Sequence, residues 1–534
     1  MSRISVPSYL LLVLGWLATI PLFLYGLGKP PVGIWDEGRV GVNAAWILRT
    51  NDWLVLRADQ PYDNLGPEPL QVWQRPVGKP AASPWLVSRL IAPPDTWNTK
   101  PPLMPWLQAL SMQWFGATAW AMRLPAALSG WLTVGVLLAF GVWGLARPGV
   151  GLLAGFILTT TPLFNSEHVT RTGDYDALLT LCVTTYLLSA WVYLRNGRFG
   201  WLLLAGLGLS LALLCKSAAA CLPLPALAVY ALCDAQRRAM LLRWQTWVAV
   251  GAAVVPLLTF YVLREQAAPG YIAASWYNDW AGRFGSHLTP GNRPWWMYVE
   301  YWFYPGLSLW SPVLLASVVA VARQRGLPEY LRFLTWQIAG TLVLLSLAQN
   351  RAHWYAAPLL PLLALLIAGL LMAWRDVWAR RWLAFGLVWK VGVGGLVVAE
   401  AVVLLRAHER LANTLRQNSH IAYEMALPRI VETVLPQPEV IVLRDEFNSA
   451  LDFTLLTLPA AYRPMILTMQ PRHAAGMQAL RAGQQVLGTW PEDRAWLAAR
   501  FRLVPLVVLA EPAWCVRLEP RRPGPAGAVL ADKP

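Results

Sequence analysis

Residues 353–374 read HWYAAPLLPLLALLIAGLLMAW and hold no Asp, Glu, Lys or Arg. An α-helix of about 20 apolar residues crosses the hydrocarbon core of a bilayer, so this run predicts a membrane-spanning helix. Ten similar runs lie elsewhere in the chain, and some are short or contain Pro, which predicts about 11–13 transmembrane helices in an all-α polytopic domain. The other runs are 9–27, 122–145, 149–165, 175–194, 200–215, 218–234, 245–263, 302–322, 333–348 and 382–405.

The composition of the 534-residue chain agrees with a membrane protein. Hydrophobic residues make up 56% and charged residues only 14%, against about 25% charged in soluble domains. The mean hydropathy is +0.42. A disordered chain, a disulfide scaffold and an ordinary cytosolic enzyme are therefore excluded. Lys and Arg number 44 and Asp and Glu 29, a net charge of +15. Cytoplasmic loops of membrane proteins carry such an excess, so no nucleic-acid partner is inferred.

The distribution of Arg predicts the orientation and the domains. Arg is more frequent in the segments on the side of the N-terminus, as at Arg237, Arg238 and Arg243. This bias predicts a cytoplasmic N-terminus. We expect a transmembrane domain over 1–405, an outer α/β domain over 406–520 and a disordered tail over 521–534. The outer loop 28–121 is expected to hold interfacial helices, as at 41–50 and 104–115, and the α/β domain to hold strands at 440–443, 453–458, 485–487 and 503–509.

Polar residues gather in loops on the predicted outer side, but each has an ordinary explanation as well. Asp36 and Glu37 are adjacent carboxylates that repel each other, which suits one of them to act as a base. They also fit the N-terminus of a helix, which favours acids. Lys100, at the level of the lipid headgroups, suits a phosphate or simply extends to the interface. The remaining candidates fit a site, a helix cap or an interfacial anchor: Asp174, Asp176, Lys216, Arg293 and Tyr355.

The order of these residues resembles the ArnT/PMT-like membrane glycosyltransferases, which have the GT-C fold. This family includes the lipid A aminoarabinose transferases and the protein O-mannosyltransferases. The resemblance covers about residues 8–375. It is carried by Asp36-Glu37-x-Arg39, Asn51-Asp52-Trp53-Leu54, Lys100-Pro101-Pro102-Leu103 with Trp106, Phe115-Gly116, Trp120-Ala121-x-Arg123-Leu124-Pro125, Thr161-Pro162-Leu163-Phe164, Asp176 to Thr180, Lys216, Arg293-Pro294-Trp295-Trp296-x-Tyr298, Leu309-Trp310-Ser311-Pro312 and Tyr355-x-x-Pro358.

The resemblance implies a bacterial inner-membrane enzyme with its site on the periplasmic face. It implies that one sugar moves from an undecaprenyl-phosphate donor to lipid A, another glycan or a protein hydroxyl, with inversion. Asp36 and Asp176 are implied as the catalytic carboxylates. The other roles implied are support of the site by Glu37, Arg39 and Asp174 and binding of the donor phosphate by Lys100, Lys216, Tyr355 and Arg293.

The chain departs from the family pattern in three places that bear on the site. The stretch between Leu54 and Lys100 is longer than usual, Ser217-Ala218 replaces the common Gly-Pro after Lys216, and Asp174 is an additional acid. No ligand spacing implies a metal, and no cofactor is expected. The alternative of another class is a transporter or binding protein for a lipid-linked glycan or polysaccharide. Such a protein would carry its essential polar residues within the spans.

Overall fold

The computed structural model describes residues 6–33, 35–58, 70–74, 86–87, 92–281, 293–323, 327–378, 385–416, 426–427, 429–430, 433, 439–444, 448–457, 466–471 and 477–521. The chain folds as two compact units. The membrane unit consists of residues 1–30, 39–58 and 94–412, and the sheet unit consists of residues 31–38, 59–93 and 413–534. The expected tail after residue 521 lies outside the described residues.

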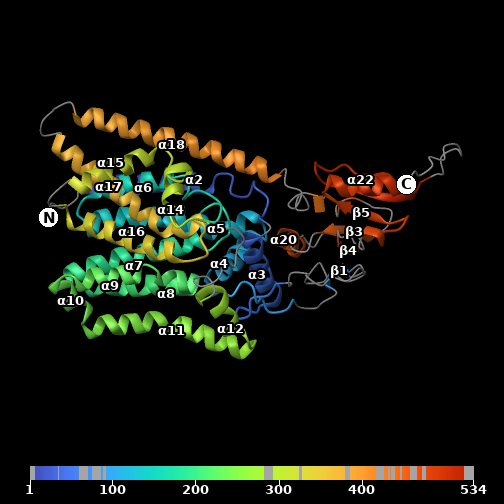
Figure 1. Ribbon diagram of the computed structural model, residues 1–534, viewed down its shortest axis with the longest axis horizontal. Helices are drawn as coiled ribbons and strands as arrows, with labels where there is room; N and C mark the ends of the chain where they lie inside the picture. The colour runs from blue at the N-terminus through green and yellow to red at the C-terminus, as the bar shows by residue number, and fades with distance from the viewer. Residues whose placement is uncertain are drawn as a thin grey trace, which may run out of the picture. The chain divides into compact units, whose positions relative to one another are not determined.

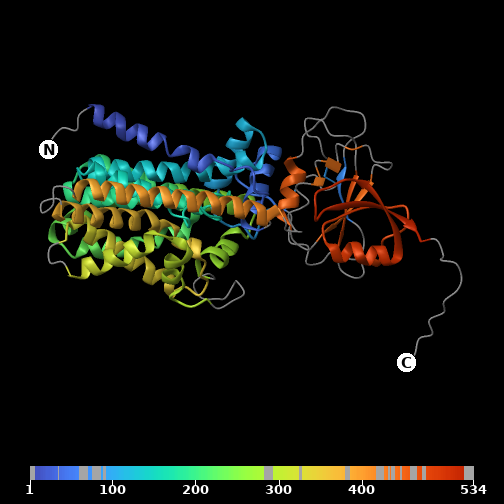
Figure 2. The same ribbon diagram turned by 90° about the horizontal axis from the view of Figure 1, so that it is seen from above.

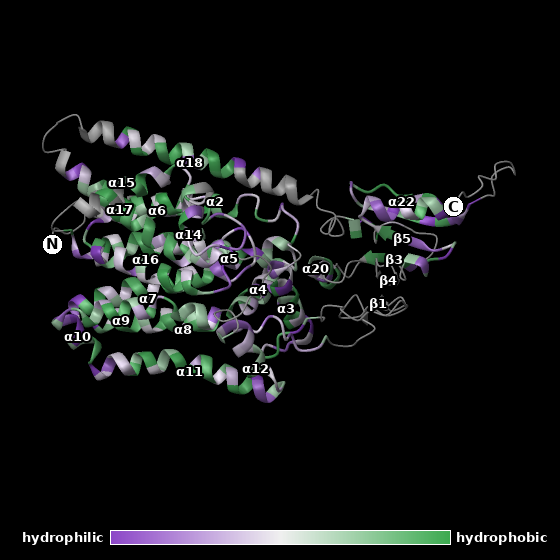
Figure 3. Ribbon diagram, in the orientation of Figure 1, coloured by the Kyte–Doolittle hydropathy of each residue, from purple (hydrophilic) through white to green (hydrophobic). Residues whose placement is uncertain are grey.

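The membrane unit is a bundle of helices whose surfaces are largely apolar (Figures 1 and 3). Six described helical segments are long and apolar enough to cross a membrane: Ala119–Gly144, Asp176–Asn196, Phe199–Cys221, Trp244–Ala267, Glu329–Leu347 and His353–Asp376. The helices are α1 (Val6–Leu17), α2 (Ile20–Leu24), α3 (Asp36–Thr50), α4 (Leu103–Phe115), α5 (Ala119–Ala139), η1 (Phe140–Gly144), α6 (Pro148–Thr160), α7 (Asp176–Asn196), α8 (Phe199–Cys221), α9 (Leu224–Leu232), α10 (Ala235–Leu241), α11 (Trp244–Ala267), α12 (Tyr271–Ser275), η2 (Trp276–Trp280), α14 (Met297–Tyr301), η3 (Trp302–Gly306), α15 (Trp310–Arg323), α16 (Glu329–Leu347), η4 (His353–Leu359), α17 (Leu360–Trp378) and α18 (Phe385–Arg416).

The predicted fold class is confirmed, because each of the eleven apolar runs falls on helical structure. Two runs were predicted to meet at Lys216, and the structure breaks the helix there. Lys216 has φ −151° and ψ 69° inside α8, which separates the run before it from the run after it. The polar residue and the break coincide because a lysine inside a membrane helix is costly, whereas at a break it can reach a polar partner.

Helix α7 lies at the centre of the bundle. Nearly all of its side chains are buried, and it packs against α5, α8 and η4. The helix ends at Gly197, which has φ +65°, a value that glycine adopts without strain. On the outside of the bundle, α1 lies along α5 and α6 (Figure 2).

The short polar segments divide between the two ends of the bundle. Helix α10 lies at the end where the N-terminus lies, and α3, α4 and α12 lie at the opposite end (Figure 1). Two buried arginines donate hydrogen bonds to backbone carbonyls of α2 and of the segment that follows it. Arg123 donates to the carbonyls of Leu27 and Pro30, and Arg171 donates to those of Phe23 and Tyr25. The motif residue Arg123 therefore has a structural task.

The sheet unit holds a seven-stranded sheet in the order β2-β1-β4-β3-β5-β7-β6. Strand β3 is parallel to β4 and β5, and the other pairs are antiparallel. The strands are β1 (Leu70–Gln74), β2 (Leu86–Val87), β3 (Glu439–Arg444), β4 (Ile466–Pro471), β5 (Gln485–Gly488), β6 (Phe501–Val507) and β7 (Trp514–Pro520). Strands β1 and β2 come from the long first loop, which therefore completes the sheet of the C-terminal region.

One predicted strand is wrong. Residues 453–458 were expected to be extended, but residues 453–457 lie in the helix α20 (Ser449–Thr457), and residue 458 lies outside the described residues. The side chain of Asn448 accepts a hydrogen bond from the backbone N–H of Leu451, which caps the helix. A short apolar run fits a buried helix as well as a strand, and the cap decides for the helix. The strands expected at 440–443, 485–487 and 503–509 correspond to β3, β5 and β6.

Candidate active site

A buried ion pair fixes the loop that carries Lys100. Arg39, in the first turns of α3, forms two hydrogen bonds to Asp95, at 2.9 and 2.7 Å. Both side chains are almost fully buried. Asp95 also accepts hydrogen bonds from Asn43 and from the backbone of Trp97 and Asn98. Burial alone would raise the pKa of Asp95, but the hydrogen bonds and charge of Arg39 outweigh it, so its pKa lies below the usual value.

Lys100 is held at the end of this loop, 8% exposed. Its Nζ lies 3.5 Å from the side-chain oxygen of Asn98 and 5.4 Å from the centre of the Tyr175 ring, where a cation is attracted to the aromatic face. The amide of Asn98 donates to Tyr175 and Asn43, at 2.9 and 2.7 Å. Lys100 therefore lies beside the residue that precedes Asp176.

Asp176 and Lys216 form a salt bridge. The Nζ atom of Lys216 lies 2.8 and 3.0 Å from the two carboxylate oxygens of Asp176. The same Nζ lies 5.1 Å from the centre of the Tyr355 ring. Asp176 begins α7, Lys216 stands at the break in α8, and Tyr355 lies in η4. Three segments far apart in the sequence thus bring three of the predicted site residues together.

These three residues line the polar end of a pocket that is otherwise mainly apolar. The pocket opens to the outside of the bundle, and its empty space together with the open mouth amounts to about 840 Å³. The other polar residues of the lining are Ser217, Asp279, Thr341 and Asn350. The apolar walls come from α7, α8, α16 and η4 and the segments next to them: Leu179, Ala218, Ala219, Leu222, Pro223, Leu345, Ala348, Pro358 and Leu359.

Asp279 connects this pocket to the Lys100 loop. Its carboxylate accepts a hydrogen bond of 2.6 Å from the hydroxyl of Thr99. The backbone carbonyl of Thr99 accepts a hydrogen bond from Tyr271, at 2.7 Å. Lys100 is the next residue in the chain, so its backbone is fixed to a residue that lines the pocket. Sequence reasoning did not identify Asp279 or Asp95, because only the folded chain places them beside the motif residues.

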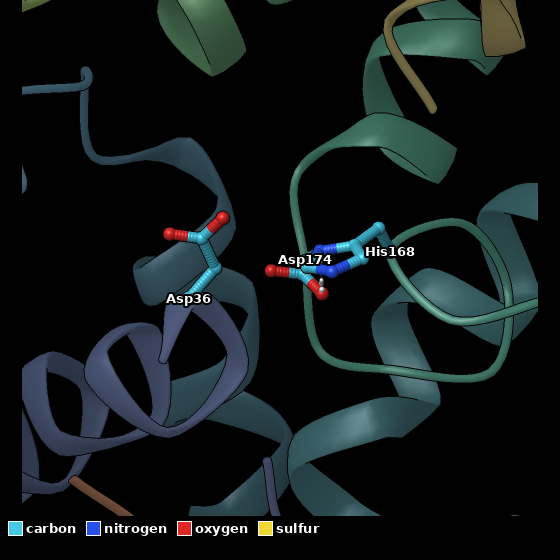
Figure 4. Close-up of side chains that lie close together, drawn as sticks. All are labelled: Asp36, His168 and Asp174. Atoms are coloured by element: carbon cyan, nitrogen blue, oxygen red, sulfur yellow. Dashed lines mark ion pairs between the residues drawn. The ribbon is translucent and has the colours of Figure 1, made fainter. Parts of the chain in front are cut away.

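Asp174 pairs with His168 in the loop before α7 (Figure 4). The Nδ1 atom of His168 lies 3.3 Å from the Oδ2 atom of Asp174, which also accepts a hydrogen bond from Thr172, at 2.6 Å. Burial alone would raise the pKa of Asp174, but the charge and hydrogen bond of His168 and the Thr172 hydroxyl lower it below the usual value. The imidazole stacks on the indole of Trp354, with ring centres 3.8 Å apart. Sequence reasoning gave no role to His168, and its spacing carries no signal.

The acidic pair at the start of α3 divides into two different environments. Glu37 is buried, and its carboxylate accepts a hydrogen bond of 2.8 Å from the backbone N–H of Gly33. This bond gives Glu37 the structural task that the helix-terminus interpretation predicts. Asp36 is the first residue of α3 and is half-buried. It is drawn in Figure 4.

Arg293 is not among the residues that line the pocket. It is exposed and lies just before α14. Its backbone carbonyl accepts a hydrogen bond from Arg351, and its guanidinium lies 3.9 Å from the sulfur of Met297. A role for Arg293 in phosphate binding stays a prediction.

Comparison with known proteins gives matches to one group of transferases. Residues 99–262 match the family model described as dolichyl-phosphate-mannose-protein mannosyltransferase. An undecaprenyl phosphate-alpha-4-amino-4-deoxy-L-arabinose arabinosyl transferase from Serratia proteamaculans is 26% identical over 294 residues, 53% of this chain and 51% of that protein. A putative mannosyltransferase, YycA, from Bacillus subtilis is 33% identical over 138 residues, 24% of this chain and 19% of that protein.

The whole chain shares its fold with a solved structure. ArnT from Cupriavidus metallidurans bound to undecaprenyl phosphate superposes with a TM-score of 0.64 at 15% identity, over 96% of this chain and 98% of that one. By sequence, the chain spans about half the length of the curated relatives it matches. The matching segment, the aligned relatives and the shared fold confirm the resemblance inferred from the motifs: the chain is similar to the ArnT/PMT-like proteins and has the fold of the solved ArnT.

Proposed function

We propose that the protein is an integral membrane glycosyltransferase that moves one sugar from a polyprenyl-phosphate donor to an acceptor outside the cytoplasm. The observation that carries this proposal is the pocket with a charged end and apolar walls. A polyprenyl-phosphate sugar has the same division, with an anionic phosphate between a sugar and a long apolar chain. The undecaprenyl phosphate bound to the ArnT of similar fold supports the same donor class.

The proposed donor phosphate binds at the polar end of the pocket. Lys216 and Tyr355 line that end, and Lys100 is fixed to it through Thr99 and Asp279. When the bond between the sugar and the phosphate breaks, the departing phosphate gains negative charge, and nearby cations stabilise that charge in the transition state. Asp176 orients the Lys216 ammonium with both of its oxygens. We assign donor phosphate binding to Lys100, Lys216 and Tyr355 on these grounds.

The proposed chemistry is a single displacement with inversion. The acceptor hydroxyl attacks the anomeric carbon, its proton passes to a carboxylate, and polyprenyl phosphate leaves with the bonding electrons. We assign the base to Asp36, because Glu37 is engaged with the backbone of Gly33. Arg39 and Glu37 hold α3, which carries Asp36 at its first position. Asp174 with His168 supports the loop that leads to Asp176.

The proposed location is the inner membrane of a bacterium, with the candidate site on the periplasmic side. The end of the bundle with the N-terminus and α10 carries Arg237, Arg238 and Arg243. Cytoplasmic loops are enriched in such residues, so this end faces the cytoplasm. The opposite end, with α3, α4 and α12, then faces the periplasm. The periplasmic side is where a lipid, glycan or protein acceptor would be met.

The first prediction concerns donor turnover. Purified full-length protein is incubated with a panel of undecaprenyl-phosphate sugars and crude envelope extract as acceptor, and free undecaprenyl phosphate is measured. We expect release from one donor, and we expect Asp36→Asn to lose at least about 100-fold of that activity, as removal of a general base does. The control is Asp234→Asn, the same change of residue type at the N-cap of α10, at the other end of the bundle, where Asn also caps a helix.

Full activity of Asp36→Asn would remove the base assignment. No release from any donor would reject the transferase proposal in favour of a protein that binds or transports a lipid-linked glycan. Analysis of the labelled products separates a lipid or glycan acceptor from a protein hydroxyl.

A further inference from the structure

The sheet unit contains an open groove with a net positive charge. The groove lies between α22 (Pro491–Arg500) and strands β6 and β7, and α22 covers one face of the sheet (Figure 2). The charged residues that line it are Arg494, Arg502, Arg521 and Glu511. Three guanidinium groups against one carboxylate favour an anion in the groove.

The helical spacing of α22 explains why the groove exists. Asp493 and Leu497 are four residues apart and buried beneath the helix. Arg494 and Ala498 are likewise four residues apart and lie on the side that lines the groove, together with Ala495. Residues at this spacing share one face of a helix. The two alanines leave room beside the arginine that a larger side chain would fill.

The guanidinium groups are held to different degrees. Arg521 donates a hydrogen bond of 3.0 Å to the backbone carbonyl of Ala499, which fixes it at the end of α22. Arg502 lies 4.0 Å from Glu519, a loose ion pair. The guanidinium of Arg494 has no hydrogen-bond or ion-pair partner within the described part of the chain. The groove therefore combines a fixed cation with cations that are available to a ligand.

The rest of the lining is apolar. Phe501 and Leu503 pack against the core of the sheet unit while also lining the groove. Trp514 lines it too, and its Nε1 donates to the carbonyl of Trp490. Mostly apolar walls with a few placed polar groups are typical of small-ligand sites. Guanidinium groups bind phosphate with two parallel hydrogen bonds, which a lysine cannot do.

We propose that this groove binds a phosphate-bearing saccharide. The arginines bind its phosphate, and the apolar wall with the two alanines accommodates the carbon faces of a sugar ring. Its use as the place where a phosphorylated acceptor is held rests on the proposed glycosyl transfer. Binding itself does not depend on that reaction.

The test is calorimetric titration of the full-length protein in detergent with glucose 1-phosphate, with glucose and inorganic phosphate as separate probes. We expect glucose 1-phosphate to bind more tightly than either probe. Arg494→Gln is expected to weaken binding at least about tenfold, because hydrogen bonds to a charged group are among the stronger ones. The matched control is Arg500→Gln, on the same helix, where the guanidinium lies 3.7 Å over the Trp496 ring and outside the groove.

Equal binding of inorganic phosphate would overturn the saccharide assignment, and equal losses in both variants would overturn the site. A second titration with a phosphorylated disaccharide lipid in the same detergent identifies the source of the ligand: tighter binding than glucose 1-phosphate points to a glycolipid, and equal binding to a soluble glycan. Absence of binding beside donor turnover would reject the groove and leave the proposed function standing. Binding without turnover of any donor would support the groove and reject the proposed function.

Discussion

At the scale of single residues, Lys100 offers the clearest separation of two roles. Its ammonium lies beside Asn98 and over Tyr175, so it acts either on the donor phosphate or only on the packing of its loop. We expect Lys100→Ala to raise the KM for the lipid donor at least about tenfold, the loss typical of a hydrogen bond to a charged group. Steady-state kinetics with the donor identified by the panel measures this change.

The control for Lys100 is Lys29→Ala. Lys29 is an exposed lysine whose Nζ lies 4.9 Å from the centre of the Tyr25 ring, so it shares the cation–π contact but lies outside the pocket. The KM of Lys29→Ala for the lipid donor is expected to stay at the wild-type value. An unchanged KM in Lys100→Ala, with a protein that melts at a lower temperature, would show that Lys100 only supports the loop.

The candidate site shows what residue spacing could and could not predict. Asp36, Lys100, Asp176, Lys216 and Tyr355 were identified because their motifs occur in a recognisable order. The salt bridge between Asp176 and Lys216 joins residues 40 positions apart, and spacing alone gave no reason to pair them. The partners that hold the motif residues, Asp95 and Asp279, stand in no recognisable pattern. They were found only once the fold placed them there.

At the scale of elements, the ion pair of Arg39 with Asp95 connects α3 to the Lys100 loop. Asp95→Asn keeps the hydrogen-bonding shape but leaves a buried guanidinium without its counter-charge, which costs about 3–5 kcal/mol. We therefore expect a clear fall in the melting temperature in detergent at pH 7. Asp376→Asn is the control, because the pair of Asp376 with Arg375 is exposed and such pairs contribute about 0–1 kcal/mol. Equal melting temperatures in the two variants would contradict this account.

The same pair sets a pH dependence. The folded pKa of Asp95 is depressed, so its contribution to stability is fully present above the unfolded pKa of about 3.9 and is lost as pH falls through the folded pKa. The difference in melting temperature between the wild type and Asp95→Asn is thus expected to be constant above about pH 5 and to shrink below about pH 4.

Elements were predictable where one physical requirement dominates. A bilayer demands a long apolar run, so the helical regions of the bundle followed from the sequence. No single physical requirement of this kind determines the helices and strands of the sheet unit. Residues 453–458 were apolar enough for either structure, and the cap at Asn448 favours the helix that residues 453–457 form. Strand β1 pairs with residues almost 400 positions away, as Leu70 does with Met469. A local sequence pattern does not indicate such a distant partner.

At the scale of the whole molecule, the order of spans along the chain sets the side of the membrane on which the C-terminal region lies. The eleven apolar runs predict an odd number of spans, so a cytoplasmic N-terminus would place the C-terminal region in the periplasm. The concentration of Arg237, Arg238 and Arg243 around α10 supports a cytoplasmic position for that loop. If the site and the sheet unit both work on envelope acceptors, the C-terminus has to be periplasmic.

A pair of reporter fusions tests this topology. Alkaline phosphatase is active only when exported, and we expect activity when it is fused after residue 521. A matched fusion placed after Arg243, in the segment between α10 and α11, is expected to be inactive. Activity in both fusions would contradict the assignment of α10 to the cytoplasm. Inactivity in both would mean that the number of spans is even, and the C-terminal region would have to be assigned to the cytoplasm.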